Sequence, residues 1–281
     1  MQVFKKISPL RAKIKKEKKS GQEIGFVPTM GYLHQGHLAL LEQAREENDI
    51  VVLSIFVNPT QFGPDEDLEE YPRDIERDLK LAEKVGCDLV FIPEADEIYS
   101  PQAATKVIVE GLTNKLCGAS RDGHFAGVCT IVTKLFNITL PNRAYFGQKD
   151  AQQVLVIKRL VKDLNFDLEI KTVNIVREAD GLAVSSRNKY LNSKERKAGL
   201  VLFDSLNLAK KLITTGARDA EFVKEKIKEK IANEPLAKID YVEIVTQNSL
   251  ETVEKISGEI LIALAVYIGE TRLIDNLMME V

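Results

Sequence analysis

Residues 24–58 read IGFVPTMGYLHQGHLALLEQAREENDIVVLSIFVN, and their hydrophobic pattern indicates the fold class. A short apolar strand is predicted at Ile24–Pro28, and the turn TMGYLHQGH follows it. Leu38–Glu47 carries apolar residues at helical spacing, which predicts an amphipathic helix. Ile50–Asn58 is an almost uninterrupted apolar run, typical of a parallel-sheet strand with both faces covered. The stretch therefore predicts a strand–helix–strand unit.

The same alternation continues to about residue 176. Further helices are predicted at Tyr71–Val85, Val128–Ile138 and Ala151–Leu164, and further strands at Asp88–Ile92, Thr105–Val109, Arg143–Phe146 and Leu168–Val176. Alternation of this kind, with right-handed crossovers, predicts an α/β fold, a Rossmann-like parallel sheet with helices on both faces. Ligands bind such sheets beyond the carboxyl ends of the strands. Ligand-binding residues are therefore expected in the turns that follow Pro28, Asn58, Phe146 and Val176.

The pattern changes after Tyr190. Helices are predicted at Ser193–Thr214 and Asp219–Ala232, and strands near Ile239–Thr246, Ile260–Ile268 and Arg272–Met279. Asn192 with Glu195 three residues later resembles a capping box at the start of the first of these helices. These elements predict a smaller C-terminal α+β domain. We place the domain boundary so that residues 1–175 form the Rossmann-like domain and residues 176–281 form the smaller domain, which closes over the site.

Composition excludes several classes of protein. The 281 residues are 44% hydrophobic and 29% charged, unlike a disordered tail, a collagen-like repeat or a disulfide scaffold. The net charge of −3 provides no basic field that would recruit nucleic acid. The basic segment Lys5–Lys19 reads as a solvated helix face, although a local nucleic-acid patch is the alternative.

Neither a membrane segment nor a secretion signal is predicted. The longest apolar run, Ile260–Ile268, spans nine residues, whereas a membrane helix needs roughly 20. No apolar stretch follows the basic start of the chain. Cys87, Cys117 and Cys129 are odd in number and form no CxxC pair, which suits a reducing compartment and disfavours disulfide or zinc sites. We expect a cytoplasmic protein.

His34-Gln35-Gly36-His37 opens the first predicted crossover helix. Imidazoles three residues apart share one face of the first helical turn, beside unpaired backbone N–H groups and the positive end of the helix dipole. Gly36 leaves room for a planar ligand to approach the backbone. The tetrapeptide therefore fits a nucleotide phosphate site, or equally a capped helix start with two surface histidines. A zinc site is disfavoured because no other His or Cys pair has familiar spacing.

Two more polar clusters follow predicted strands. Asn58 and Gln61 carry neutral donors and acceptors that suit hydroxyl and carboxylate groups, although an ordinary Asn-Pro turn would also place them there. Lys149 supplies a mobile cation for phosphate, and Asp150 could hold a hydrated Mg²⁺ or cap the following helix. Gln153 lies one helical turn beyond.

A fourth cluster is the segment 180–188, with the letters DGLAVSSRN. Ser185, Ser186 and Arg187 offer hydroxyl and guanidinium donors that can surround an anion, together with backbone N–H groups. Alone, the segment is equally well explained as a plain interdomain loop.

The combination is more specific than its parts. HxGH after the first strand and a serine–basic loop after the last strand resemble the two signatures of the nucleotidylyl-transferase and class I synthetase superfamily. In order, VPTMGYLHQGHLALL, SIFVNPTQF, YPRD, GHFAGV, FGQKDAQQ and READGLAVSSRNKYL resemble the pantoate–β-alanine ligase (pantothenate synthetase) family, from about residue 24 to 191. The resemblance implies ATP-dependent condensation of (R)-pantoate with β-alanine through a pantoyl-adenylate, releasing AMP and pyrophosphate. It also implies Mg²⁺ and a homodimer.

The resemblance also implies roles for individual residues. It assigns to the ATP site Met30, Gly31, Tyr32, Leu33, His34, Gln35, Gly36, His37, Gly147, Gln148, Lys149, Asp150, Val176, Val184, Ser185, Ser186 and Arg187. Within that set it implies catalytic roles for His34, His37, Lys149, Ser185, Ser186 and Arg187, with His37 as proton donor or phosphate stabiliser.

The substrate side is assigned in the same way. Gln61 and Gln153 would hold pantoate, with Asn58 beside them, and Gln61 is also a candidate contact for β-alanine. His124 resembles a position near the pantoate pocket, although a structural turn histidine is the alternative. Asp150 is the implied metal ligand and Asp78 a candidate outer-sphere partner. Gln148 departs from the glutamate common in the family, which removes a charge beside Lys149.

The chemistry requires several cations at once. Attack of a carboxylate on the α-phosphate brings anions together, and one like-charge pair at about 4 Å costs about 1 kcal/mol in water and about 4 at an effective dielectric of 20. A helix N-terminus contributes only about 0.3–1 kcal/mol. We therefore expect Lys149, Arg187, the histidine pair and a metal ion to act together, with no covalent nucleophile.

Two other functions stay open at this point. One is adenylyl transfer to a phosphate ester by the same fold, which the neutral side chains of Gln61 and Gln153 disfavour. The other is a non-catalytic nucleotide-binding module, which would not need Lys149 or the serine loop. An aminoacyl-tRNA synthetase is disfavoured because no basic domain of suitable size follows.

Overall fold

A computed structural model describes residues 1–64 and 66–281 and divides them into two compact units. The N-terminal unit comprises Met1–Asn114, Gly118–Gln148 and Gln152–Asn174, and the C-terminal unit comprises Lys115–Cys117, Lys149–Ala151 and Ile175–Val281. The sequence-predicted boundary at residue 175 lies beside the start of the long segment of the C-terminal unit. The two short segments of that unit were not predicted.

The N-terminal unit contains the predicted parallel sheet. Its strands are β1 (Gln2–Phe4), β2 (Ile24–Thr29), β3 (Ile50–Ile55), β4 (Leu89–Phe91), β5 (Arg143–Gly147) and β6 (Glu169–Val173). The order across the sheet is β1-β4-β3-β2-β5-β6, and every neighbouring pair is parallel. The predicted α/β fold class is confirmed. The edge strand β1 was not predicted.

The predicted strand Thr105–Val109 is wrong. Residues 103–110 form no regular element, and the backbone N–H of Val107 donates to Thr130 Oγ1 at 3.0 Å instead of to a neighbouring strand. Ile108 is 66% exposed. The β-branched composition of this segment suggested a strand, but the segment has no strand partner among the described residues.

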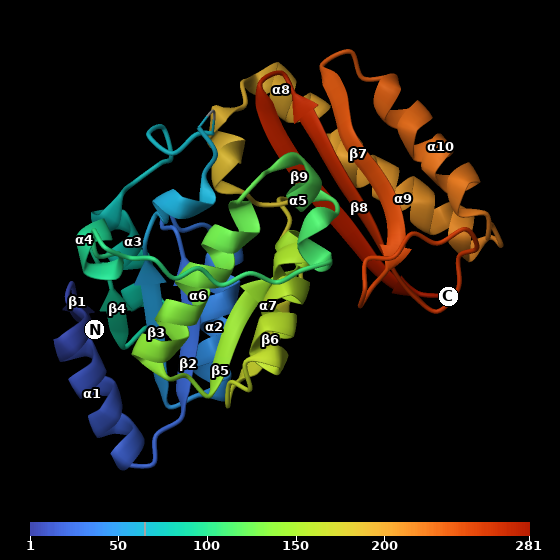
Figure 1. Cartoon of the computed structure of the whole chain (residues 1–281). Coiled ribbons are helices and arrows are strands. Elements are labelled where there is room, and N and C mark those ends of the chain that lie inside the picture. The colour runs from blue at the N-terminus through green and yellow to red at the C-terminus, as the bar shows by residue number, and fades with distance from the viewer. Residues whose placement is uncertain (65) are drawn as a thin grey trace. The chain divides into compact units, whose positions relative to one another are not determined.

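Helices cover both faces of the sheet (Figure 1). The helices of this unit are α1 (Ile7–Lys19), α2 (Gln35–Glu47), α3 (Ile75–Lys84), α4 (Ala95–Ile98) and α6 (His124–Thr139), and the helices α5 (Cys117–Ser120) and α7 (Ala151–Asp163) have residues in both units. On one face, Val27 of β2 and Tyr145 of β5 pack with Leu41 of α2 and Ala82 of α3. Successive strand residues point to opposite faces.

The other face belongs to α6, against which α1 packs. The ring of Phe26, the residue before Val27, meets Phe136 of α6 edge-on at 6.3 Å, and Phe146 meets the same ring at 6.5 Å. Because neighbouring residues of β2 and β5 thus contact helices on opposite sides, both faces of the sheet are buried.

The order of the strands reverses direction at β2 and β5. From β2 the chain moves outward on one side to β3 and β4, and later returns to add β5 and β6 on the other side. Among the described residues, the β2–β5 ladder is limited to Gly25–Phe26 and Arg143–Ala144, although both strands continue beyond it. Such a switch point, at the carboxyl ends of the strands, is where open α/β sheets bind ligands.

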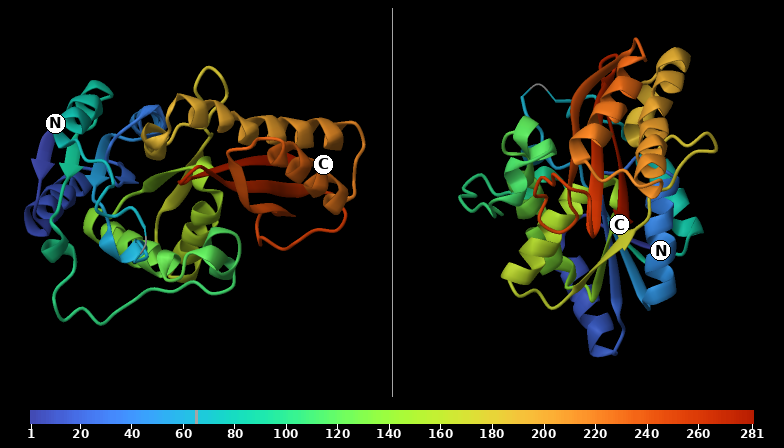
Figure 2. Two further views of the ribbon diagram at one scale, coloured as in Figure 1. Left: turned by 90° about the horizontal axis from the view of Figure 1, so that it is seen from above. Right: turned by 90° about the vertical axis from the view of Figure 1, so that its right-hand side faces the viewer.

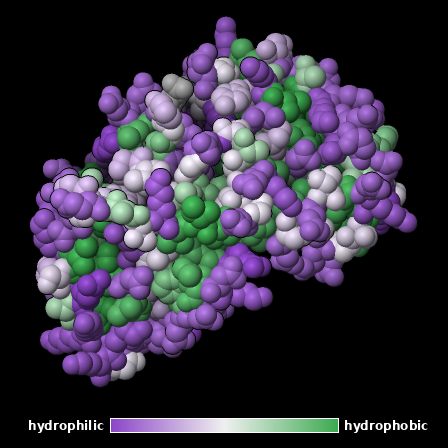
Figure 3. Space-filling model, in the orientation of Figure 1, coloured by the Kyte–Doolittle hydropathy of each residue, from purple (hydrophilic) through white to green (hydrophobic). Residues whose placement is uncertain are grey.

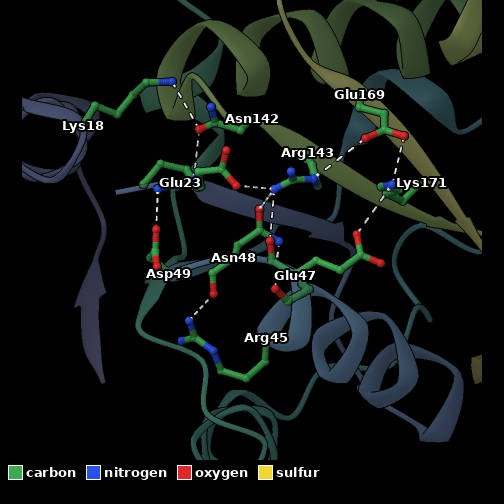
Figure 4. A network of polar contacts seen from close by, with 12 residues as sticks. Lys18, Glu23, Arg45, Glu47, Asn48, Asp49, Asn142, Arg143, Glu169 and Lys171 are labelled. Carbon is green, nitrogen blue, oxygen red and sulfur yellow. Dashed lines mark hydrogen bonds and ion pairs between the residues drawn. The ribbon is translucent and has the colours of Figure 1, made fainter. Parts of the chain in front are cut away.

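The amino edge of the sheet is closed by a polar network (Figure 4). Arg143 of β5 donates to Glu23 Oε2 at 2.6 Å and to Asn48 Oδ1 at 3.2 Å. Buried Asn48 donates to the Tyr145 hydroxyl at 2.6 Å, and that hydroxyl donates to Glu47 at 3.0 Å. The network joins β2, α2 and β5 at the edge opposite the switch-point turns.

The C-terminal unit is the predicted α+β fold. Its elements are α8 (Ser193–Ala198), α9 (Leu200–Thr214), α10 (Ala220–Ala232), β7 (Ala237–Thr246), β8 (Glu259–Ile268) and β9 (Thr271–Glu280). The antiparallel sheet has the order β7-β8-β9, and α9 and α10 lie on one side of it (Figure 2). Leu206 of α9 and Ile227 of α10 pack there against Ile262 and Leu264 of β8.

One predicted helix is divided in two. The predicted helix Ser193–Thr214 breaks at Gly199, between α8 and α9. The predicted capping box is confirmed, because Asn192 Oδ1 accepts from the N–H of Glu195 at 3.0 Å and Glu195 accepts from the N–H of Asn192 at 2.9 Å.

Hydrophilic side chains predominate on the face shown in Figure 3, with hydrophobic side chains gathered in smaller areas. Within residues 1–64 and 66–281, no helix has the length and apolar character needed to cross a bilayer.

Replacing Gly25 tests how tightly the amino edge is packed. A Cβ at Gly25 would lie 2.6 Å from Asn48 Nδ2 and 2.8 Å from its Cγ. Because Asn48 is buried and bonded to Tyr145, we expect Gly25→Ala to reduce the free energy of unfolding by about 1–3 kcal/mol, the usual cost of overpacking. Urea unfolding monitored by circular dichroism measures this. Gly63→Ala is the control, because its Cβ would be at ordinary distances of 3.7–3.9 Å from Glu66. Equal stabilities of the two variants would contradict the prediction.

Candidate active site

The turn after β2 has a left-handed backbone conformation, which favours glycine. Gly31 has φ +84°, and a Cβ there would lie 2.9 Å from Ile55 and 3.1 Å from Asp78 Oδ2. Tyr32 follows with φ +50°, also left-handed. Thr29 Oγ1 accepts from the N–H of Gly31 at 3.2 Å and donates to the carbonyl of Ser54 at 2.8 Å. The turn is thereby fixed to the ends of β2 and β3.

Asp78 of α3 fixes this turn through hydrogen bonds to its backbone. Its two carboxylate oxygens accept from the N–H groups of Tyr32 and Leu33, each at 2.7 Å, and its side chain is 0% exposed. Burial raises the pKa of Asp78, while the two N–H bonds act in the opposite direction. The sequence suggested an outer-sphere Mg²⁺ role for Asp78. The structure commits both its oxygens to the backbone instead.

The two histidines start α2 as predicted. Their rings are stacked, with centroids 3.9 Å apart and an interplanar angle of 19°. The N–H of His34 donates to His37 Nδ1 at 3.3 Å, so a proton on the neutral His37 ring lies on Nε2. A Cβ at Gly36 would lie 3.0 Å from the His34 ring, so this glycine preserves the stacking. The pair thus presents an N–H donor at a helix N-terminus beside the switch point.

The turn after β3 brings Gln61 beside the turn after β2. Gln61 Nε2 lies 3.1 Å from Met30 Sδ, and Gln61 Oε1 accepts from Asn58 Nδ2 at 3.1 Å. Asn58 is 1% exposed, and its amide also contacts the carbonyl of Gly127 and the hydroxyls of Thr60 and Tyr99. Because both donors and both lone pairs of Asn58 are used, this residue supports Gln61 and has no capacity left for a substrate.

The other predicted residues of this unit lie near the carboxyl end of the sheet. Gly147 ends β5, Gln148 follows it, and Gln153 is half-buried on the first turn of α7. His124 is buried at the start of α6, and its Nδ1 is 2.8 Å from the carbonyl of Gln61. The N-terminal unit therefore brings together Met30–His37, Asn58, Gln61 and His124.

The remaining predicted residues belong to the C-terminal unit. The segment 176–184 folds back on itself: the N–H of Val184 donates to the carbonyl of Val176 at 3.0 Å, and Gly181 at the tip has φ +101°. Ser185 Oγ accepts from the N–H of Arg187 at 3.3 Å and caps the 3-10 helix Ser186–Tyr190. Ser186 is buried. The serine–basic segment is thus a loop in which the Ser185 hydroxyl is bonded to the loop's own backbone.

Strand β9 holds this loop and Lys149 in one unit. Asp275 pairs with Arg177 through two bonds of 2.6 and 2.9 Å, and Arg177 also donates to the carbonyl of Gly181 at 3.0 Å. The next residue, Asn276, donates to the carbonyl of Lys149 at 3.0 Å. Adjacent residues of one strand therefore position both predicted phosphate-binding segments, Lys149–Ala151 and 176–187.

The sequence did not predict Asp275 and Asn276 as site residues, and it predicted a different role for Asp78. Asp275 and Asn276 lie about a hundred residues or more from the groups they hold, and Asp78 is 45 residues from Leu33. None belongs to a cluster of polar residues at a strand end, which was the signal used. The one available signal is that Asp275 and Asn276 are polar residues inside a predicted strand, and in the structure they are only 3% and 4% exposed.

Comparison with known proteins agrees with the motifs. The family model described as "Pantoate-beta-alanine ligase" matches residues 2–278. The chain is 58% identical to a pantothenate synthetase from Acetivibrio thermocellus over 281 residues, covering 100% of both chains. It is 57% identical to one from Clostridium acetobutylicum over 276 residues, covering 98% of each.

Solved structures give the same result. The pantothenate synthetase of Thermus thermophilus superposes with a TM-score of 0.94 at 45% identity, over 99% of both chains. A pantoate–β-alanine ligase from Francisella tularensis, complexed with β-γ ATP and β-alanine, superposes with a TM-score of 0.80 at 36% identity, over 99% of this chain and 97% of that one. The family predicted from the six sequence motifs is confirmed: the chain belongs to the pantoate–β-alanine ligases.

Proposed function

We propose that the chain condenses (R)-pantoate with β-alanine at the expense of ATP, through an enzyme-bound pantoyl-adenylate. The observation that carries this proposal is the stacked His34–His37 pair at a helix N-terminus, on a turn fixed by Asp78 beside the switch point of the sheet. The complex of the Francisella tularensis relative with β-γ ATP and β-alanine supports ATP as co-substrate. Family membership supports pantoate as the acid.

In the first step, a carboxylate oxygen of pantoate attacks the α-phosphorus of ATP, and the bond to pyrophosphate breaks. Charge builds on phosphate oxygens, so catalysis depends on donors already in position. We assign to this task Nε2–H of His37, the ammonium of Lys149 and the guanidinium of Arg187. Ser185 and Ser186 add hydroxyl donors.

In the second step, the amine of β-alanine attacks the acyl carbon, and the bond to AMP breaks. Gln61 and Gln153 hold pantoate in the first step and its pantoyl group in the second through neutral amides, which add no charge that would repel or neutralise the acid before it is adenylated. Asn58 fixes the amide of Gln61 for this purpose. Holding both reactants in place supplies much of the rate, because a bimolecular step becomes effectively unimolecular.

No covalent nucleophile is required, and the cysteines agree with that. Burial raises the pKa of Cys129 to about 11 and that of Cys87 to about 12. Thiols in this state are poor nucleophiles at neutral pH because the thiolate is the reactive form. None of the three cysteines, all of which lie in the described part of the chain, is in a disulfide, which suits the cytoplasmic location that we propose. We retain the homodimer as a proposal that rests on the family.

The side chains fit Mg²⁺ that arrives with ATP better than a resident metal ion. No group of three or more His, Cys, Asp or Glu side chains suited to a metal occurs in the part of the chain that the structure describes. Mg²⁺ commonly uses one or two carboxylates plus substrate phosphates and waters, and exposed Asp150 beside Lys149 meets that need. When bound, the ion would neutralise phosphate charge. Gln148 leaves Asp150 as the one carboxylate of the segment 147–150.

The order of the two steps is testable by isotope exchange. We expect exchange of labelled pyrophosphate into ATP that requires pantoate and proceeds without β-alanine, because the adenylate forms first. Exchange that needs a phosphate-ester acceptor would move the assignment to an adenylyl transferase of the same fold. ATP binding without exchange under any condition would indicate a non-catalytic module.

Removal of the proposed phosphate donors should slow adenylation. We expect Lys149→Ala and His37→Ala each to lower the single-turnover rate of adenylate formation more than tenfold, over ~1.4 kcal/mol of barrier. Lys158→Ala, which removes an exposed lysine of α7, is the matched control and should leave the rate unchanged. A normal rate in either test variant would remove that residue from the mechanism.

Asp78→Asn should loosen the ATP-binding turn without changing the shape of the side chain. An amide cannot accept both backbone N–H groups with its two terminal atoms, so one buried donor loses its partner, at about 1–3 kcal/mol. We expect the KM for ATP to rise about tenfold. Asp74→Asn on the same helix is the control, because Asp74 is an exposed N-cap that accepts from Arg77. An unchanged KM for ATP in Asp78→Asn would contradict the role of this carboxylate.

A further inference from the structure

Three charged or polar side chains form a chain of contacts that ends on Gln61. Glu66 and Arg121 make two hydrogen bonds, at 2.7 Å from Nε and 2.6 Å from Nη2 of the guanidinium. The third guanidinium nitrogen, Nη1, is 3.0 Å from His124 Nε2. His124 Nδ1 is 2.8 Å from the carbonyl oxygen of Gln61. All four residues belong to the N-terminal unit.

The chemistry of the partners fixes the protonation of His124. A guanidinium has donors and no acceptor, so Nε2 of His124 must accept from Arg121. The carbonyl of Gln61 is an acceptor, so Nδ1 must carry the proton and donate. His124 is therefore a neutral imidazole with its proton on Nδ1. The Glu66 carboxylate holds the guanidinium in the orientation that imposes this tautomer.

The Glu66–Arg121 pair is well suited to that task. Its side chains are 25% and 18% exposed, so the pair is more sheltered than an ordinary surface ion pair. Burial disfavours the charged form of Glu66, but the hydrogen bonds and charge of Arg121 outweigh it and lower the pKa of Glu66. Bidentate pairing also sets the plane of the guanidinium. Arg121 therefore has a defined direction in which to meet His124.

The segment that carries Gln61 also packs closely against α6. At Gly127 of α6, a Cβ would collide with the backbone of Thr60 and Gln61. Asn58 Nδ2 donates to the carbonyl of Gly127 at 3.3 Å and to Gln61 Oε1 at 3.1 Å. His124 fixes the Gln61 backbone, and Asn58 fixes its amide. The position of Gln61 thus depends on the first turn of α6.

We propose that His124 is a positioning residue for pantoate, which acts through the carbonyl of Gln61 and whose tautomer is set by the Glu66–Arg121 pair. This inference rests on the proposed function, in which Gln61 binds pantoate. It replaces the expectation that His124 touches the substrate, because both ring nitrogens already face protein groups. Loss of the Nδ1 donor should weaken pantoate binding and leave ATP binding unchanged.

Two isosteric variants separate the ring nitrogens. The amide nitrogen of Asn can occupy the position of Nδ1, whereas that of Gln reaches the position of Nε2. We expect His124→Gln to raise the KM for pantoate about tenfold, in line with the loss of one hydrogen bond. The kcat and the KM for ATP should change less than twofold (~0.4 kcal/mol). His124→Asn should stay within about threefold of the wild type. Equal effects of the two variants, or a loss confined to kcat, would overturn the proposal.

A measurement on the wild-type protein avoids variants that fail to fold. ¹⁵N-histidine NMR distinguishes a protonated from an unprotonated ring nitrogen, and the chain has three histidines. The resonance that disappears in His124→Asn identifies His124. We expect its proton on Nδ1 at neutral pH. A proton on Nε2 instead, or on both nitrogens, would overturn the assignment.

A second ion pair in the same unit provides a matched control for the Glu66–Arg121 pair. Glu66→Gln should raise the KM for pantoate about threefold, because Arg121 loses its orienting charge. Asp163→Asn breaks the exposed Arg159–Asp163 pair of α7 and should have no effect, since such pairs contribute ~0–1 kcal/mol. Wild-type protein without pantoate-dependent pyrophosphate exchange would defeat the proposed function itself. Normal wild-type exchange with an unchanged His124→Gln variant would defeat only this inference.

Discussion

The carboxylate of Asp78 is the interaction on which the site depends. A turn with two successive left-handed residues, Gly31 and Tyr32, exposes N–H groups that neither β2 nor α2 can satisfy. Buried Asp78 accepts two of them and so determines where α2 starts. The stacking of His34 on His37 follows from that start. An unpaired buried carboxylate would be costly, so the turn and α3 stabilise each other.

The switch point of the sheet determines where the site lies, and the N-terminus of α2 supplies N–H donors there. Hydrogen bonds and ion pairs join β2, α2 and β5 at the amino edge, while the paired part of the β2–β5 ladder stops before their carboxyl ends. The turns that follow β2 and β5 therefore leave the sheet where the β2–β5 ladder has already ended. Reactions of phosphate anions need this arrangement, because preorganised N–H groups and cations need not reorient as charge moves.

The sequence allowed the local features of the site to be predicted, and missed those that depend on distant contacts. The strand–turn–helix around His34 is formed by residues that are neighbours in the chain. The hydrophobic spacing of its strand and helix and the glycines of its turn therefore predict it. The bonds that join Asp78 to Leu33, Asn276 to Lys149 and His124 to Gln61 depend on residues that only the folded chain brings close. Thr105–Val109 shows the reverse error, because a strand-like composition has no effect without a neighbouring strand to pair with. Asn58 was assigned to the substrate because a strand end exposes polar groups, but the fold uses all its hydrogen-bonding capacity.

The two short segments Lys115–Cys117 and Lys149–Ala151 have a consequence for dissecting the protein. Each leaves the N-terminal unit and returns to it after three residues, and Asn276 bonds to one of them. A polypeptide cut at residue 175 would therefore yield a C-terminal fragment that lacks six residues of its own compact unit. Its β9 would expose an amide without its Lys149 partner. The two fragments are thus expected to regain the native fold more completely when they are mixed than when either is refolded alone.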